Sequence, residues 1–74
     1  MLGEELKKSR EEADLTQEQV SFAANIDRSY LSQLENNRKS PTVDLLFRIC
    51  DALGVSAADI IARVEKSRPP KRKK

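Results

Sequence analysis

The 74-residue sequence contains no histidine, no tryptophan and a single cysteine, Cys50, and these absences exclude several kinds of site. One cysteine cannot form an internal disulfide, and without histidine the chain lacks the ligands of the common zinc centres. We expect Cys50 to be a small buried hydrophobic residue, because it lies on the apolar stripe of a predicted helix. No metal or cofactor is expected, and the cysteine usage favours the cytoplasm.

The sequence also lacks a long hydrophobic run. No stretch is long enough to cross a membrane, and the N-terminus opens on charged residues without the apolar segment of a secretory signal. The chain has no glycine loop that would hold phosphates and no paired carboxylates at a catalytic spacing. We therefore expect no membrane partner, no small-molecule ligand and no enzymatic activity.

Aromatic residues make up 4% of the chain, so Leu, Ile, Val and Ala must fill the core. A chain of 74 residues makes one small domain, and an all-helical core keeps the cost of ordering it low because its contacts are local. Apolar residues recur at the helical period in five segments. We predict an all-α, compact five-helix fold, with helices over about 2–13, 17–24 and 28–36, a fourth between Thr42 and Gly54, and a fifth after Ser56.

The net charge of +2 is unevenly placed, because five of the fourteen basic residues lie within residues 67–74. Residues 1–66, the predicted domain, contain nine basic and twelve acidic residues, a net charge of −3. The net charge of the domain therefore does not indicate nucleic-acid binding, and only the positions of individual charged residues can indicate it. Two prolines and dense charge predict a disordered basic tail over 67–74. A solubilising role or non-specific attraction to phosphates is favoured for the tail over a localisation signal.

The segment from about residue 16 to 36 predicts two short helices joined by a tight turn. Thr16 and Asp27 stand where a side-chain oxygen can cap each helix, and Asn25 lies at the reversal, where it tolerates the left-handed conformation. The outward residues of the second helix are of the types that reach base edges and phosphates in a DNA groove: Arg28, Ser29, Ser32 and Gln33. This arrangement is typical of a helix-turn-helix.

Residues 2 to about 64 resemble the lambda-repressor-like, Cro/C1-type helix-turn-helix family. The motifs that carry the resemblance are Thr16-Gln17-Glu18, Tyr30-Leu31-Ser32-x-Leu34-Glu35, Pro41-Thr42 and Ala52-Leu53-Gly54-Val55-Ser56. A narrower similarity, to the controller proteins of restriction–modification systems, rests on Phe22, Asn25 and Asp27-Arg28-Ser29-Tyr30. The family commonly has Gly where Asn25 and Asn37 stand, and Ala where Ser21 stands, so the Ser21 hydroxyl needs a partner.

The resemblance implies a role for individual residues. The base-facing set is Arg28, Ser29, Ser32 and Gln33. The backbone-binding set is Gln17, Tyr30, Asn36, Arg38 and Lys39. Arg10 and Glu35 form an internal ion pair between the first and third helices, and Gln17 also braces the reading helix. Alternatives stay open for four of these residues: Ser29, Ser32 and Gln33 could be ordinary solvated surface residues, and Tyr30 could pack on the fourth helix. Phe22 is expected to pack against a neighbouring helix, and contact with a partner is the less favoured alternative.

One recognition helix contacts too few base pairs to discriminate alone, and a dimer on a palindrome doubles the contacts. We therefore predict a sequence-specific double-stranded DNA-binding transcriptional regulator that acts as a homodimer. The predicted dimer interface is Ile60, Ile61 and Val64 of the fifth helix, where apolar surface exceeds what a small domain can bury. The alternative is a protein-binding adaptor or antitoxin-like module with the same helical fold. Salt-dependent duplex binding with a sequence preference discriminates the two.

Overall fold

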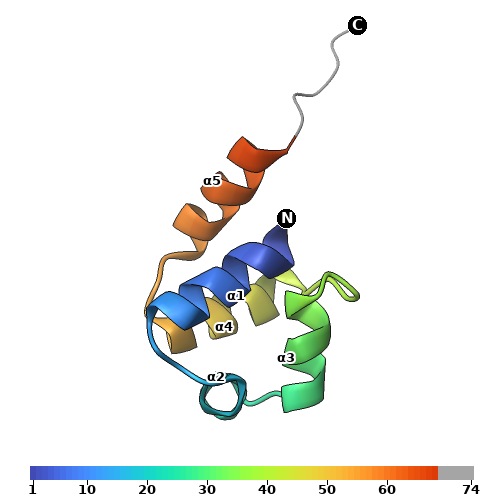
Figure 1. Cartoon of the computed structure of the whole chain (residues 1–74), viewed down its shortest axis with the longest axis vertical. Helices are drawn as coiled ribbons and strands as arrows, with labels where there is room; N and C mark the ends of the chain where they lie inside the picture. The colour runs from blue at the N-terminus through green and yellow to red at the C-terminus, as the bar shows by residue number, and fades with distance from the viewer. Residues whose placement is uncertain (69–74) are drawn as a thin grey trace, which may run out of the picture.

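The computed structural model describes residues 1–68, and this part of the chain forms five α-helices (Figure 1). Their bounds are Leu2–Glu12 for α1, Gln17–Ala24 for α2, Arg28–Glu35 for α3, Val43–Leu53 for α4 and Ala57–Ser67 for α5. The predicted all-α fold is confirmed, and the first and third helices end one residue earlier than predicted. Ser67 was predicted to open the tail, but it is the last residue of α5, and Arg68 follows as the C-cap. The rest of the predicted tail, 69–74, lies outside the described residues.

Side-chain caps begin three of the helices. The Thr16 hydroxyl accepts from the backbone N–H of Gln19 at 3.0 Å, and the Gln19 amide oxygen accepts from the N–H of Thr16 at 2.8 Å. The hydroxyls of Thr42 and Ser56 accept from the backbone N–H of Leu45 and Asp59 at 3.1 and 3.4 Å, which caps α4 and α5. The predicted cap by Asp27 is wrong in one respect: Asp27 occupies the N-cap position of α3, but its side chain makes no cap hydrogen bond. Its carboxylate is exposed, so water can satisfy it instead.

Three of the chain reversals use a left-handed residue where the sequence predicts one. Asn25 has φ 61° after α2, Asn37 has φ 61° after α3, and Gly54 has φ 75° after α4. Asparagine tolerates this region because its short polar side chain bonds locally, so it replaces glycine at modest cost. Asp14, between α1 and α2, also has a positive φ of 62°, which no sequence pattern predicted.

The core gathers aliphatic side chains from all five helices. α2 packs on α4, and α1 packs on both α3 and α5. The fully buried side chains are Leu6, Val20, Leu31, Leu34, Ile49, Cys50 and Ile60. Cys50 is a core residue, as predicted, and its burial raises the pKa of the thiol. None of the helices in residues 1–68 is long and apolar enough to span a membrane.

Gly3 lets the start of α1 approach the end of α3 closely. A Cβ at this position would lie 2.7 Å from the backbone oxygen of Glu35 and 2.7 Å from Oδ1 of Asn37, nearer than real Cβ atoms come. The bare backbone N–H of Gly3 instead donates to Oδ1 of Asn37 at 2.9 Å. Gly3 therefore sets the distance between α1 and the loop that leaves α3.

Candidate nucleic-acid interface

α3 divides cleanly into a buried face and an exposed face. Leu31 and Leu34 are each 1% exposed and join the core, and Glu35 is buried beside them. On the opposite face, Arg28, Ser29 and Gln33 are exposed and Ser32 is half-buried. The base-facing set therefore lies on the side of α3 that a groove of DNA could receive.

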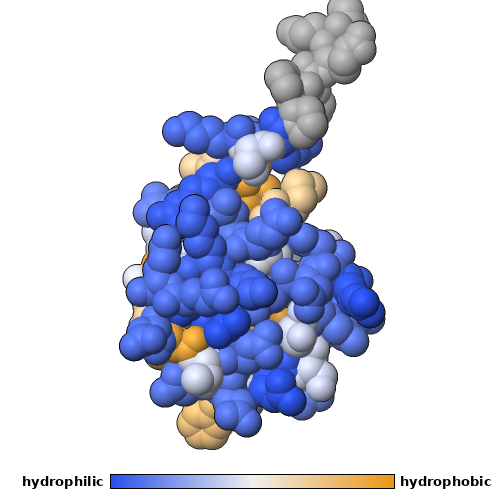
Figure 2. Space-filling model, in the orientation of Figure 1, coloured by the Kyte–Doolittle hydropathy of each residue, from blue (hydrophilic) through white to orange (hydrophobic). Residues whose placement is uncertain are grey.

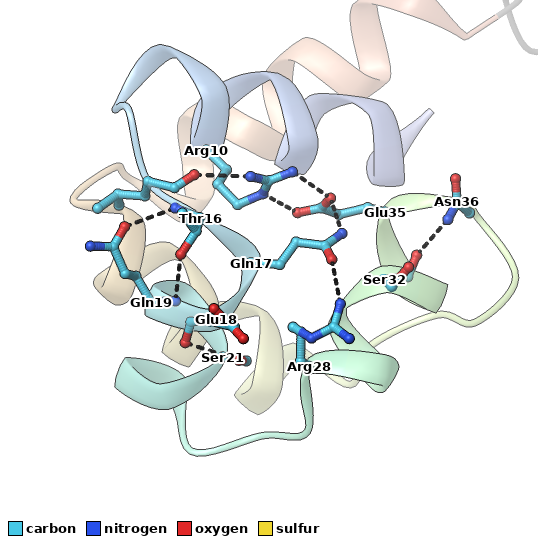
Figure 3. A network of polar contacts seen from close by, with 11 residues as sticks. Arg10, Thr16, Gln17, Glu18, Gln19, Ser21, Arg28, Ser32, Glu35 and Asn36 are labelled. Carbon is cyan, nitrogen blue, oxygen red and sulfur yellow. Dashed lines mark hydrogen bonds and ion pairs between the residues drawn. The ribbon is translucent and has the colours of Figure 1, made fainter.

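A bidentate ion pair joins α1 to the end of α3, at the position that the resemblance implies. Nε of Arg10 donates to Oε2 of Glu35 at 2.7 Å, and Nη2 donates to Oε1 at 3.1 Å (Figure 3). The side chains are 12% and 2% exposed, respectively. The third donor of Arg10, Nη1, binds the backbone oxygen of Leu15 at 2.9 Å, so one guanidinium ties three segments together. The bond with Glu35 raises the pKa of Arg10, which keeps the guanidinium charged.

The buried pair extends outward through Gln17 to the exposed Arg28. Nε2 of Gln17 donates to Oε1 of Glu35 at 3.0 Å, and Nη1 of Arg28 donates to Oε1 of Gln17 at 3.5 Å (Figure 3). An ionised carboxylate can only accept hydrogen bonds, so the NH₂ group of Gln17 points toward Glu35 and its amide oxygen points toward Arg28. A contact network thus runs from the core to the first residue of α3.

Three other members of the backbone-binding set lie at the C-terminal end of α3 and beyond it. Asn36, Arg38 and Lys39 are exposed at the end of α3 and in the loop that follows. Nδ2 of Asn36 donates to the backbone oxygen of Ser32 at 2.9 Å, which holds its side chain along the helix end. Tyr30, in the first turn of α3, is half-buried and packs against the core, which favours the packing alternative.

Two predicted positions need correction. Phe22, expected to pack against a neighbouring helix, is 89% exposed on α2, because the buried face of that helix is taken by Val20, Ser21 and Ala24. Ile60, placed in the dimer interface by the sequence, is 0% exposed and belongs to the core. It faces the interior because α5 packs on α1 through this residue's side of the helix, while Ile61 faces outward.

Two contacts around α2 complete this region. The Ser21 hydroxyl donates to the backbone oxygen of Glu18 at 3.1 Å, which supplies the partner that the sequence required. Arg48 of α4, which belongs to none of the predicted sets, reaches the C-terminal end of α2. Its guanidinium donates to the backbone oxygen of Ala24 at 2.8 and 3.2 Å and to that of Asn25 at 3.0 Å. The one sequence signal for this contact is that α2 has no basic residue of its own in its last turn.

Comparison with known proteins agrees with this geometry. The model of a helix-turn-helix family matches residues 6–60, which is most of the chain. The chain belongs to the Cro/C1-type helix-turn-helix family. It is 34% identical over 67 residues to an uncharacterised helix-turn-helix transcriptional regulator, y4dJ, of Sinorhizobium fredii, covering 90% of this chain and 87% of that protein. This membership makes the chain a DNA-binding transcriptional regulator and not an enzyme.

Two further likenesses bear on the narrower resemblance. The control protein C.MunI of a Mycoplasma species is 34% identical over 65 residues, covering 86% of this chain and 88% of that protein. The crystal structure of ClgR, the clp gene regulator of Corynebacterium glutamicum, superposes with a TM-score of 0.87 at 33% identity, covering 95% of this chain and 91% of that one. The fold is therefore shared by controller proteins and by other regulators alike.

Proposed function

We propose that this regulator binds a palindromic operator as a homodimer and reads it with the base-facing set. The observation that carries the proposal is the exposed polar face of α3, whose opposite face is anchored in the core and in the Arg10–Glu35 pair. An anchored helix presents its side chains without a large ordering cost on binding. The compartment we propose is the cytoplasm, because the named relatives belong to bacteria, whose DNA lies there.

Arg28 is the main specificity residue in this proposal, and Gln33 is the second. Arg28 stands at the N-terminal end of α3, where a reading helix enters the major groove. Its guanidinium can donate two parallel hydrogen bonds to O6 and N7 of guanine, and no other base offers that pair of acceptors. In the free protein Gln17 holds one of those donors, so Gln17 pre-positions Arg28 as well as binding phosphate.

The phosphate contacts come from the two ends of the helix-turn-helix. Gln17 lies at the start of α2, and Asn36, Arg38 and Lys39 lie beyond the end of α3. These residues bracket the base-facing set, so they can hold the register of α3 along the groove. Phosphates carry no sequence identity, and these contacts therefore supply affinity without specificity.

The dimer surface that we propose is an apolar groove between α4 and α5. It is lined by Val43, Leu46, Phe47, Ala57, Ala58, Ile61, Ala62 and Glu65, with a volume of about 390 Å³. Three of these side chains are strongly exposed for their size: Val43 at 67%, Phe47 at 53% and Ile61 at 46%. Figure 2 shows hydrophobic surface beside α5 on a molecule that is otherwise mostly hydrophilic in this view.

A second copy suits this groove because a twofold axis would bury the same apolar residues from both protomers at once. Ile61 therefore stays in the predicted interface, with Val64 half-buried beside it, while Phe47 and Val43 replace Ile60. Two reading helices about 34 Å apart would match one turn of B-DNA. Operator occupancy would then depend on protein concentration through the monomer–dimer equilibrium.

The decisive experiment compares Arg28→Ala with Arg38→Ala on an operator selected from random duplexes and on its single-base variants. Arg28→Ala should cost about 1–3 kcal/mol on the best site and relax the preference at one position in each half-site. Arg38→Ala is the matched control, since it removes the same charge and should weaken every sequence alike. A uniform loss for Arg28→Ala, with base preferences unchanged, would move Arg28 to the backbone-binding set.

A further inference from the structure

Arg48 occupies a position that neither the base-facing set nor the backbone-binding set explains. It belongs to α4, yet its guanidinium binds the last residue of α2 and the first residue of the turn. The three bonds, at 2.8, 3.0 and 3.2 Å, bridge 23 and 24 positions of sequence. These bonds join α4 to the C-terminal end of α2 and to the turn between α2 and α3.

The end of α2 needs such a partner for two physical reasons. The last carbonyl oxygens of a helix have no N–H donor within the helix, and they form the negative end of the helix dipole. The last turn of α2 contains no basic residue, so within this helix nothing answers that charge. A planar guanidinium supplies both a positive charge and donors spaced to bridge two neighbouring carbonyl oxygens.

The turn that Arg48 binds, which begins at Asn25, sets the angle between α2 and α3. Asn25 adopts the left-handed conformation there, and its N–H and that of Ile26 bond back to Phe22 and Ser21 at 3.2 and 2.9 Å. Arg28 begins α3 three residues after Asn25. Any loosening of this turn would shift Gln17 and Arg28, at the starts of the two helices, relative to each other.

We propose that Arg48 is a positioning residue for DNA recognition: it locks the turn between α2 and α3 from α4 and touches no DNA itself. This role rests on the proposed function, because its consequence is the simultaneous fit of phosphate and base contacts. Loss of the lock should reduce specific binding more than non-specific binding, since the latter tolerates a range of angles.

The experiment uses the full chain with Arg48→Met, Arg48→Lys and, as a control for lost charge, Lys8→Met on the exposed face of α1. Amide hydrogen exchange of the free protein reports the lock without DNA. In Arg48→Met the amides of Asn25 and Ile26 should exchange about tenfold faster, while the Leu6 amide in α1 keeps its rate. Arg48→Lys should restore part of this protection, because it keeps the charge but not the bridge. Unchanged exchange at both turn amides would overturn the proposal.

Binding to the selected operator and to a scrambled duplex of equal length supplies the second measurement. Arg48→Met should lower the affinity for the operator about tenfold, lower the affinity for the scrambled duplex much less, and leave the salt dependence of binding unchanged. Lys8→Met should leave the ratio of the two affinities unchanged. A salt slope reduced by about one would show that Arg48 binds a phosphate, which would also overturn the proposal. If the wild type bound no duplex, the proposed function would fail, whereas the exchange result would still decide whether Arg48 holds the turn.

Discussion

The two sides of this small domain are held by different forces. Around α1, α2 and α3, polar side chains bridge the helices: Arg10 to Glu35, Gln17 to Glu35, and Asn37 to Gly3. Between α4 and α5, the lining is apolar, and Phe47 and Ile61 leave half of their surface in water. The first side pairs its buried Glu35 carboxylate within the monomer, and the second has hydrophobic surface that a partner could still cover.

The difference follows from what each side must do. Hydrogen bonds have preferred lengths and angles, so a polar network fixes the position of the reading helix more sharply than apolar packing would. An apolar groove has no such directional demand, and it gains free energy whenever its surface is removed from water. The proposed function calls for both, because a rigid face toward DNA needs directional bonds and a surface for a second copy needs exposed apolar area.

The largest effect should come from breaking the polar side. Arg10→Met leaves the Glu35 carboxylate, 2% exposed, with Gln17 as its remaining side-chain partner, and should lower the free energy of unfolding by about 3–5 kcal/mol. Urea denaturation measures this loss. Glu35→Met should cost less, because Arg10 is closer to solvent and keeps its bond to Leu15. Equal, small losses in both variants would mean that the pair is not the anchor of α3.

The apolar side should respond through association and not through folding. Phe47→Glu places a charge in the groove and should weaken dimerisation by about 2 kcal/mol or more, measured by sedimentation over a range of concentrations. Phe22→Glu is the matched control, since Phe22 is 89% exposed on α2, away from the groove. If both variants shifted the equilibrium alike, or neither did, the groove would not be the dimer surface.

A smaller effect separates two glycines that serve different purposes. Gly3→Ala should destabilise the fold by about 1–2 kcal/mol, because the clash with the end of α3 outweighs the roughly 1 kcal/mol gain in helix propensity. Gly54→Ala should cost about 1 kcal/mol for its left-handed φ of 75°, although its Cβ would meet open space.

Substitution by asparagine should affect the two glycines differently, and the midpoints of thermal unfolding of the variants measure the difference. Gly54→Asn should recover most of the lost stability, since Asn25 and Asn37 already adopt this conformation. Gly3→Asn should be worse than Gly3→Ala, because its larger side chain meets the same backbone oxygens. Recovery by asparagine at both positions would mean that close packing does not govern Gly3.

The smallest effect concerns Cys50, which lies in the core that both sides share. Burial raises the pKa of its thiol, so the folded protein keeps the neutral form at a pH where the unfolded chain begins to ionise. The contribution of Cys50 to stability should therefore be constant below the unfolded thiol pKa of about 8.5 and decline as pH rises above it. Urea midpoints at successive pH values measure the decline, which should be shallower in Cys50→Ala. An identical decline in that variant would assign it to other groups.

The sequence by itself determined the local structure. Thr16, Thr42 and Ser56 begin helices because their hydroxyls accept from the first turn, and Asn25, Asn37 and Gly54 end them because they accept a left-handed backbone. These effects act over three or four residues, so they can be read from neighbours in the chain. The resemblance to a known family, carried by short motifs, added the pairing of Arg10 with Glu35.

The tertiary structure alone decided which faces meet. Ile60, Ile61 and Phe22 are all apolar residues of predicted helices. The packing of α5 on α1 buries Ile60 and leaves Ile61 exposed, and the packing of α2 on α4 leaves Phe22 exposed. The contact of Arg48 with the turn likewise joins residues 23 and 24 positions apart, and the lack of a basic residue in the last turn of α2 does not indicate which helix supplies one. The physical reason is that an amphipathic pattern specifies how much surface a helix buries, whereas the packing angles between helices choose the side chains that do so.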